Sequence, residues 1–153
     1  MVEQFFAESP WAASKFPGET LLRFAHQGVH ASWVCFAQVH ESVRRVVVYS
    51  VPYGESPVER RAEVAEFLTR ANYGLHVGNF EMDVDDGEIR FKTSVDLEGS
   101  ELSQEMLRRL VQINLSLVDR YLVGIQLVLA GSTPLEAVEI AEGRGDAGDG
   151  LGK

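Results

Sequence analysis

The chain has 153 residues and a formal net charge of −9, and 45% of its residues are hydrophobic. This length and composition fit one globular domain with a sizeable core, and the acidic charge argues against a nucleic-acid groove, which needs clustered lysine and arginine. The single cysteine, Cys35, excludes an intrachain disulfide and fits a reducing cytoplasm, where we expect the protein to reside.

The first third of the chain predicts a short helix followed by three strands. Val2, Phe5 and Phe6 form the apolar face of a helix that breaks near Pro10. Three apolar stretches joined by short turns then indicate strands, at residues 20–26, 31–40 and 43–51.

The second and third of these strands are apolar on both faces, although a sheet in a two-layer domain should have one wet face. The residues that need cover are Trp33, Val34, Phe36, Val47 and Tyr49. One solution is that the aromatic residues of the N-terminal segment fold over the second face and leave a monomer. The solution that we favour is a homodimer, because the same patch then covers itself across a two-fold axis.

Residues 56–74 predict a capped helix. Ser56-Pro57-Val58-Glu59 has the pattern of a capping box with proline at the first helical position. An apolar stripe follows at helical spacing, and Gly74 is expected to end the helix in a left-handed conformation. The arginine pairs 44–45, 60–61 and 108–109 are interpreted as solvated surface.

Residues 79–96 predict a β-hairpin with Asp86-Gly87 as a two-residue turn. With that turn, Glu81 faces Lys92 and Asp83 faces Arg90 on one face of the hairpin. On the other face Phe80, Met82 and Val84 lie opposite Thr93, Phe91 and Ile89. The opposed charges would contribute only about 0.2–1 kcal/mol each, and their role is to oppose slippage of the register.

One long helix is predicted over residues 106–129, with a kink at Gly124 and a stop at Gly131. Ile113 and Leu117 form a second apolar edge on it, which adds them to the candidate dimer surface. Thr133-Pro134-Leu135-Glu136 is a second capping box that opens a short helix to about residue 142. Residues 1–142 therefore form one domain of α+β class, an antiparallel sheet of about five strands in the order α-βββ-α-ββ-α-α. Residues 143–153 are expected to form a disordered tail.

No pattern in the chain indicates catalysis, a cofactor or a metal. The acidic hairpin turn superficially resembles a calcium loop, but its glycine and final acid are misplaced, and the four histidines lack zinc-site spacing. Cys35 lies in a strand among apolar residues, where an inert thiol is expected. No apolar run approaches the roughly 20 residues of a membrane span, and no signal peptide is recognised.

One polar group at the end of the helix over 58–73 is a candidate partner-binding site. It consists of Arg70, Asn72 and Tyr73. The structural alternative is that Asn72 caps backbone carbonyls and Arg70 pairs with an acid such as Glu81.

The segment FLTRANYGLHVGNFEMDVDDGEIRFKTSVD resembles the YbjN-domain family, especially its cyanobacterial members. Its most specific matches are Asn72-Tyr73-Gly74 and Gly78-Asn79-Phe80-Glu81, and residues 56–140 fit throughout, including Asp119-Arg120-Tyr121-Leu122. The resemblance implies a fold similar to type III secretion chaperones, which are small, acidic, dimeric α+β proteins. The family is often labelled a putative bacterial sensory transduction regulator, and no catalytic residues come with that label. Relatives are expected to have proline where this chain has Val123.

Two functions remain open at this point. The first is a non-catalytic, homodimeric binding or regulatory module that holds a partner polypeptide, as a secretion chaperone does. The second is a small-ligand receptor or enzyme with a pocket under the long helix, although no convergent set of titratable residues supports it.

Overall fold

The computed structural model describes residues 1–144 and has the predicted α+β architecture. Its six strands form one antiparallel sheet in the order β1-β2-β3-β4-β6-β5. The two-residue strand β1 was not predicted, because two residues carry no recognisable period. In chain order the elements are α1 (Val2–Glu8), β1 (Ser14–Lys15), β2 (Leu21–Gln27), β3 (Ser32–His40), a 3₁₀ turn (Glu41–Val43), β4 (Arg45–Glu55), a second 3₁₀ turn (Val58–Arg60), α2 (Arg61–Tyr73), β5 (Asn79–Met82), β6 (Glu88–Asp96), α3 (Gln104–Leu129) and α4 (Pro134–Ala141).

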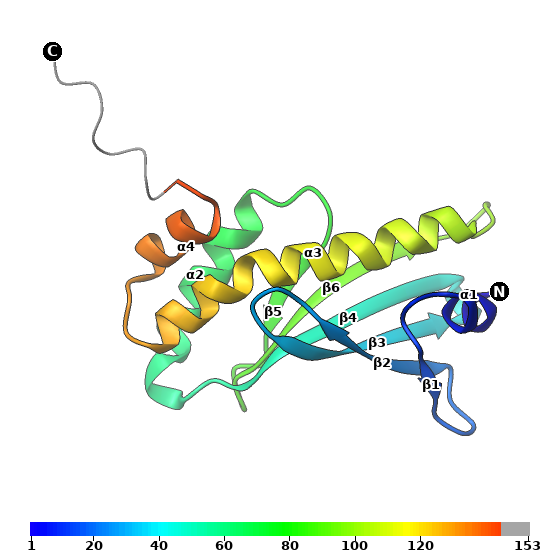
Figure 1. Ribbon diagram of the computed structural model, residues 1–153, viewed down its shortest axis with the longest axis horizontal. Helices are drawn as coiled ribbons and strands as arrows, with labels where there is room; N and C mark the ends of the chain where they lie inside the picture. The colour runs from blue at the N-terminus through cyan, green and yellow to red at the C-terminus, as the bar shows by residue number, and fades with distance from the viewer. Residues whose placement is uncertain (145–153) are drawn as a thin grey trace, which may run out of the picture.

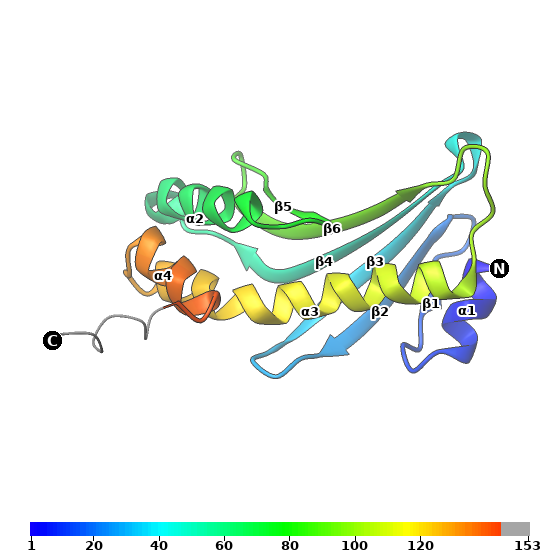
Figure 2. The same cartoon turned by 90° about the horizontal axis from the view of Figure 1, so that it is seen from above.

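All four helices lie on one side of the sheet or at its ends. The long helix α3 crosses one face, while α1 lies at one end of the molecule and α2 and α4 gather at the other (Figure 1). Figure 2 shows that no helix lies over the face turned away from α3. We call that second face the open face. Residues 143–153 were predicted to be disordered, and residues 145–153 of this segment lie outside the described residues.

The N-terminal helix does not cover the open face. Phe5 and Phe6 are buried, and the Phe6 ring lies 5.1 Å from the ring of Phe24, which points toward the α3 side of β2. The helix α1 therefore extends the helical layer over the β2 end of the sheet. The N-terminal lid considered as an alternative to a dimer is absent within residues 1–144.

A buried polar cluster joins α3 to the sheet. The Asn114 side chain is fully buried and donates to the carbonyl of Val48 at 3.0 Å and to the hydroxyl of Thr93 at 3.2 Å. Its carbonyl oxygen accepts from the Ser50 hydroxyl at 2.6 Å. The indole N–H of Trp33 donates to the same Ser50 oxygen at 3.0 Å. These bonds fix the position of α3 along β4 and β6, because the buried Asn114 amide would otherwise have no hydrogen-bond partners.

The hairpin faces were predicted correctly for the paired residues, but Val84 lies in the loop and is 70% exposed, and the predicted register was wrong by two residues. Phe80 pairs with Phe91, Glu81 with Arg90 and Met82 with Ile89. The loop is four residues long, 84–87, because the Asp83 N–H donates to Glu88 O and the Gly87 N–H donates to Asp83 O. A shift of two preserves the alternation, so the Phe80 and Phe91 rings still share a face, with centroids 4.6 Å apart.

Arg61 explains why this longer loop forms. Its guanidinium donates to three carbonyls of the hairpin loop, those of Val84, Asp85 and Asp86, at 2.7–3.2 Å. Its Nε donates to Ser56 O at 3.1 Å. A guanidinium carries five N–H donors in a fixed geometry, so one arginine can bind several carbonyls of the longer loop at once.

The expected capping box at Ser56 is not formed. The α-helix begins only at Arg61, after a 3₁₀ turn, and the buried Ser56 hydroxyl has no hydrogen-bond partner among the described residues. The Ser56 backbone instead bonds to Gly87 and Arg61. Gly74 likewise has an ordinary φ of −94°, and the left-handed residue is Gly78, with φ of +80°.

Replacing Arg61 with methionine should lower the free energy of unfolding by about 1 kcal/mol. The loop carbonyls then hydrogen-bond to water instead, which limits the cost. The stability falls because the hairpin loop is no longer held to α2. Urea denaturation measures the stability, and amide exchange at Gly87 should accelerate. Arg108→Met is the matched control, because Arg108 makes only an exposed pair with Glu105 on its own helix. Equal effects of the two substitutions would contradict the anchoring role of Arg61.

Two other arginines that were expected to be solvated also donate hydrogen bonds to backbone carbonyls. Arg60 donates to the Val128 carbonyl at 2.6 Å at the end of α3, and Arg44 donates to Ser100 O at 2.8 Å.

The predicted capping box of α4 is present, with Thr133 and Glu136 bonded reciprocally. At Gly124, α3 is one continuous helix, and the missing side chain allows a close approach by Phe67.

Candidate interaction surfaces

The open face has an apolar centre on its two middle strands. Alternation along β3 and β4 places five side chains there, which we call the open-face strip: Val34, Phe36, Val47, Tyr49 and Val51. Phe36 lies opposite Tyr49 and Val34 opposite Val51. Val47 is only 5% exposed because its neighbours cover it, and the other four are half-buried. The strip is contiguous, and no element within residues 1–144 lies over it (Figure 2).

Cations border the open-face strip on both sides. Arg23 of β2 lies opposite Phe36, and Lys92 of β6 lies opposite Tyr49. The Arg90 guanidinium lies 4.8 Å from the centre of the Tyr49 ring, which is cation–π distance. Arg23 forms no ion pair within the part of the chain that the structure describes.

Glu81 is the carboxylate that holds two of these cations. It accepts from Arg90 at 2.7 Å and also pairs with Lys92. Partial burial by itself would raise the pKa of Glu81, but the hydrogen bonds and charges of Lys92 and Arg90 outweigh it and hold the pKa below its usual value. Glu88 of β6 also lies close to Arg90. The three bordering cations therefore meet two carboxylates, both on the β6 side, and the unbalanced charge is that of Arg23.

The predicted dimer surface is divided among three places. Val34, Phe36, Val47 and Tyr49 lie in the open-face strip, as described above. Trp33, which is 4% exposed, points to the opposite face and belongs to the core. Strand alternation separates it from Val34, so it is not available to a partner. The remaining two residues, on α3, line a separate groove.

This second surface is a groove of about 460 Å³ between α3 and the loop that follows α2, which we call the α3 groove. Ile113 and Leu117 of α3 form one wall, and Leu75 and Val77 of the loop form the other. Val77 is 42% exposed. The side chains along the groove are mostly apolar and uncharged.

The three residues of the candidate group Arg70, Asn72 and Tyr73 make separate contacts. Asn72 binds the backbone of β5, since its amide accepts from the Phe80 N–H at 2.7 Å and donates to Phe80 O at 3.0 Å. Arg70 pairs with Glu66 on its own helix at 2.7 Å rather than with Glu81. Tyr73 is 96% exposed. The structural interpretation therefore holds for Asn72, although its partner is a strand edge rather than a helix end.

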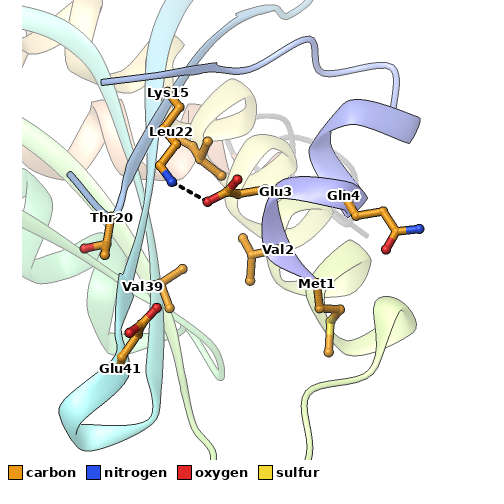
Figure 3. Close-up of a pocket in the computed structure, with 9 residues that line it drawn as sticks. All are labelled: Met1, Val2, Glu3, Gln4, Lys15, Thr20, Leu22, Val39 and Glu41. Atoms are coloured by element: carbon orange, nitrogen blue, oxygen red, sulfur yellow. Dashed lines mark hydrogen bonds and ion pairs between the residues drawn. The ribbon is translucent and has the colours of Figure 1, made fainter. Parts of the chain in front are cut away.

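The third surface is a hollow of about 490 Å³ between α1 and the strands β2 and β3 (Figure 3). Val2, Leu22 and Val39 point toward it, and Glu3 and Lys15 form an ion pair of 2.5 Å beside it. The hydrogen bond from Lys15 holds the pKa of Glu3 below its usual value. Both side chains are about half exposed or more, so this pair steadies α1 only weakly.

Asp119 of α3 holds the turn between β2 and β3. Its two carboxylate oxygens accept from the N–H groups of Val29 and His30, each at 3.1 Å. The His30 ring also contacts the Asp119 carbonyl at 3.0 Å. Partial burial by itself would raise the pKa of Asp119, but the two backbone hydrogen bonds and the His30 ring outweigh it, so the pKa lies below its usual value.

Replacing Asp119 with asparagine should lower the free energy of unfolding by about 1 kcal/mol at neutral pH. Because the folded pKa is lower than the unfolded value of about 3.9, the carboxylate stabilises the fold above about pH 4 and this contribution is lost as the pH falls through the folded pKa. The difference between wild type and Asp119→Asn should therefore shrink in acid. Urea denaturation across this pH range measures it, and a difference that is constant with pH would contradict the role of the charge.

None of the surfaces carries a recognisable catalytic group. Burial raises the pKa of the Cys35 thiol to about 11, so it is a poor nucleophile at neutral pH. Within residues 1–144, no three metal-ligating side chains converge in a group that could hold an ion. Of the helices in the described part of the chain, none is long and apolar enough to cross a membrane.

Comparison with known proteins places this fold. The model of the YbjN family, described as "Putative bacterial sensory transduction regulator", matches residues 1–127. The chain belongs to the YbjN family. The crystal structure of YbjN from E. coli, described as a putative transcription regulator, is similar with a TM-score of 0.57 over 84% of this chain and 87% of that one, at 13% identity. At that identity the likeness concerns the fold alone. No curated protein gave a significant match.

The residues that carry the YbjN resemblance hold the scaffold together. Asn72 joins α2 to the edge strand β5, as described above. Arg120 donates to the carbonyls of Ala141 and Glu142 and so ends α4, and the hydroxyl of Tyr121 donates to Glu142 at 2.9 Å. These contacts give Asn72, Arg120 and Tyr121 structural roles, whereas Tyr73 of the same motifs is 96% exposed.

Proposed function

We propose that this YbjN-family protein is a non-catalytic binding or regulatory module that works as a homodimer and holds a partner polypeptide. The role resembles that of the type III secretion chaperones, and the sequence is of the cyanobacterial type. The observation that carries the proposal is the open-face strip, a contiguous apolar surface on a sheet whose other face is already covered. A monomer that exposed such a surface would risk aggregation unless a partner covered it.

The α3 groove is the better candidate for the dimer interface. In a two-fold contact the same patch meets itself, so each border of the patch meets either the same or the opposite border of the second copy. Both borders of the open-face strip carry cations, so in either arrangement Arg23 would lie near another cation at a cost. The α3 groove has Gln112 and Ser116 beside Ile113 and Leu117, which allows self-contact without repulsion.

Sedimentation at micromolar concentration tests the dimer. Wild type should sediment as a dimer, and Leu117→Glu should dissociate it. Leu135→Glu is the matched control, because Leu135 is 48% exposed on α4, away from the groove. A wild-type species near the 17.0 kDa chain mass that does not change on concentrating would overturn the dimer.

Affinity purification from native lysate tests the polypeptide partner. Tagged wild type should retain a partner that Phe36→Asp releases, because the aspartate places a charge in the centre of the open-face strip. Val58→Asp is the control, since Val58 is 73% exposed elsewhere on the chain. Retention of the same partner by all three proteins would contradict a site on the open face.

A small-ligand receptor is the second candidate. The α3 groove has about the volume of a small-molecule site. Its one guanidinium, that of Arg120, already donates to two backbone carbonyls, which leaves the groove with few free polar groups to orient a ligand. A melting shift with a metabolite in a thermal-shift screen, together with no retained protein, would favour this candidate over the first.

A further inference from the structure

The sheet edges give the first constraint on how a polypeptide could bind. A partner strand would need a free row of backbone groups at an edge. At β5 the outward N–H and C=O of Phe80 are both bonded to the Asn72 side chain. The opposite edge, β1, is only two residues long. On β2 only residues 24–27 extend past β1. Strand addition therefore has only short free edges within residues 1–144, which favours binding through side chains on a face.

The dimensions of the open-face strip fit a helix. From Val47 to Val51 the strand advances about 13 Å, and the strip is two strands wide. An α-helix rises about 5.4 Å per turn, so the strip matches two to three turns with apolar residues at helical spacing. The other face of the same sheet already packs against a helix, α3, over β4 and β6.

The charges around the strip specify the flanks of that helix. Arg23 stands on one side without an ion pair among the described residues, and Arg90 and Lys92 share Glu81 on the other. Arg23, unpaired within residues 1–144, stands out on a chain whose net charge is −9, whereas Glu81 and Glu88 already lie beside the cations of the other side. Acidic side chains beside the apolar stripe would meet these cations, whereas basic ones would be repelled.

We propose that the open face binds an amphipathic helix of another protein whose apolar stripe is flanked by aspartate or glutamate. This inference rests on the proposed function for the existence of a polypeptide partner, and it adds the chemistry and the site. Aromatic and apolar side chains of the helix would pack on Phe36 and Tyr49. Its carboxylates would pair with Arg23 on one side and with Lys92 and Arg90 on the other.

Two designed peptides provide the probe. Each is a helix of about 18 residues, long enough for measurable helicity, and carries a fluorescein label and the same leucine stripe, with glutamate flanks in one and lysine flanks in the other. Fluorescence anisotropy with full-length protein should show about tenfold tighter binding of the glutamate peptide, and added salt should weaken that binding. Equal affinities for the two peptides would overturn the proposal.

Variants of the protein locate the site. Arg23→Glu should weaken binding of the glutamate peptide about fivefold or more. Arg109→Glu is the matched control, because it makes the same charge change on α3 and should leave binding unchanged. Circular dichroism and melting curves verify that both variants are folded. Loss of binding in both variants, or in neither, would overturn the assignment to the open face.

Two further outcomes separate this inference from the proposed function. If Arg23→Glu retains the native partner from lysate as wild type does, the proposed function stands and the assignment of the charged border fails. Tight binding of a labelled oligothymidylate that is lost in Arg23→Glu, with no peptide binding, would replace the helix by a single-stranded nucleic acid stacked on Phe36 and Tyr49.

Discussion

Replacement of Asn114 with leucine should lower the free energy of unfolding by about 3 kcal/mol. Leucine removes the acceptor of the Ser50 hydroxyl and the donor to the Val48 carbonyl, and all these groups are buried between α3 and β4. Each orphaned neutral group costs about 1–3 kcal/mol, which outweighs the gain from the larger apolar side chain. Urea denaturation followed by circular dichroism measures the change.

Gln126→Leu is the control for this experiment. Gln126 lies on the same helix but is exposed, so the substitution should change the free energy of unfolding by no more than about 0.5 kcal/mol. Equal stability of Asn114→Leu and Gln126→Leu would show that the buried cluster does not hold α3 on the sheet.

Replacement of Gly124 with alanine should destabilise the fold by about 2 kcal/mol, although the same change at an open helical position stabilises by about 1 kcal/mol. A Cβ at Gly124 would lie 2.5 Å from Cε2 of the Phe67 ring and 3.1 Å from the carbonyl oxygen of Ala137. Phe67 is fully buried, so α2 or α4 must move away from α3. The sign of the effect therefore distinguishes a packing glycine from a flexible kink.

Thermal and urea unfolding of a double-mutant cycle decides between these two roles. Phe67→Leu removes the ring that the new methyl group would meet, so Gly124→Ala should cost much less in that background. Gln126→Ala, at an exposed position of the same helix, is the propensity control and should be neutral or slightly stabilising. Stabilisation by Gly124→Ala in the wild-type background would mean that α2 and α4 do not pack tightly on this position.

The sequence predicted the apolar residues of the open-face strip but not the charged residues beside it. The apolar residues on the second face of β3 and β4 were predictable, because alternation with period two separates the faces of a strand. Trp33 was assigned to the wrong set, since a sequence with apolar residues on both faces does not say which face meets α3. Arg23, Arg90 and Lys92 become neighbours of Phe36 and Tyr49 only through strand pairing.

One residue of the buried polar cluster, Asn114, is recognisable in the sequence as a polar residue within an apolar stripe. Asn114 falls at helical spacing between Val111 and Val118 in the buried stripe of α3, where an asparagine needs hydrogen-bond partners. Its partners Ser50 and Thr93 are far away in the sequence. A local pattern predicts that such a residue requires partners, but only packing supplies them.

What the sequence by itself determined is local. It established the α+β class, the order of the elements, the faces of the hairpin and the cap at Thr133, because these depend on the period of apolar residues and on nearby backbone groups. The tertiary structure decided the hairpin register, through Arg61, and the place of α1 beside α3 rather than on the open face. A register and a face depend on contacts between distant segments, and a local pattern is equally compatible with several of them.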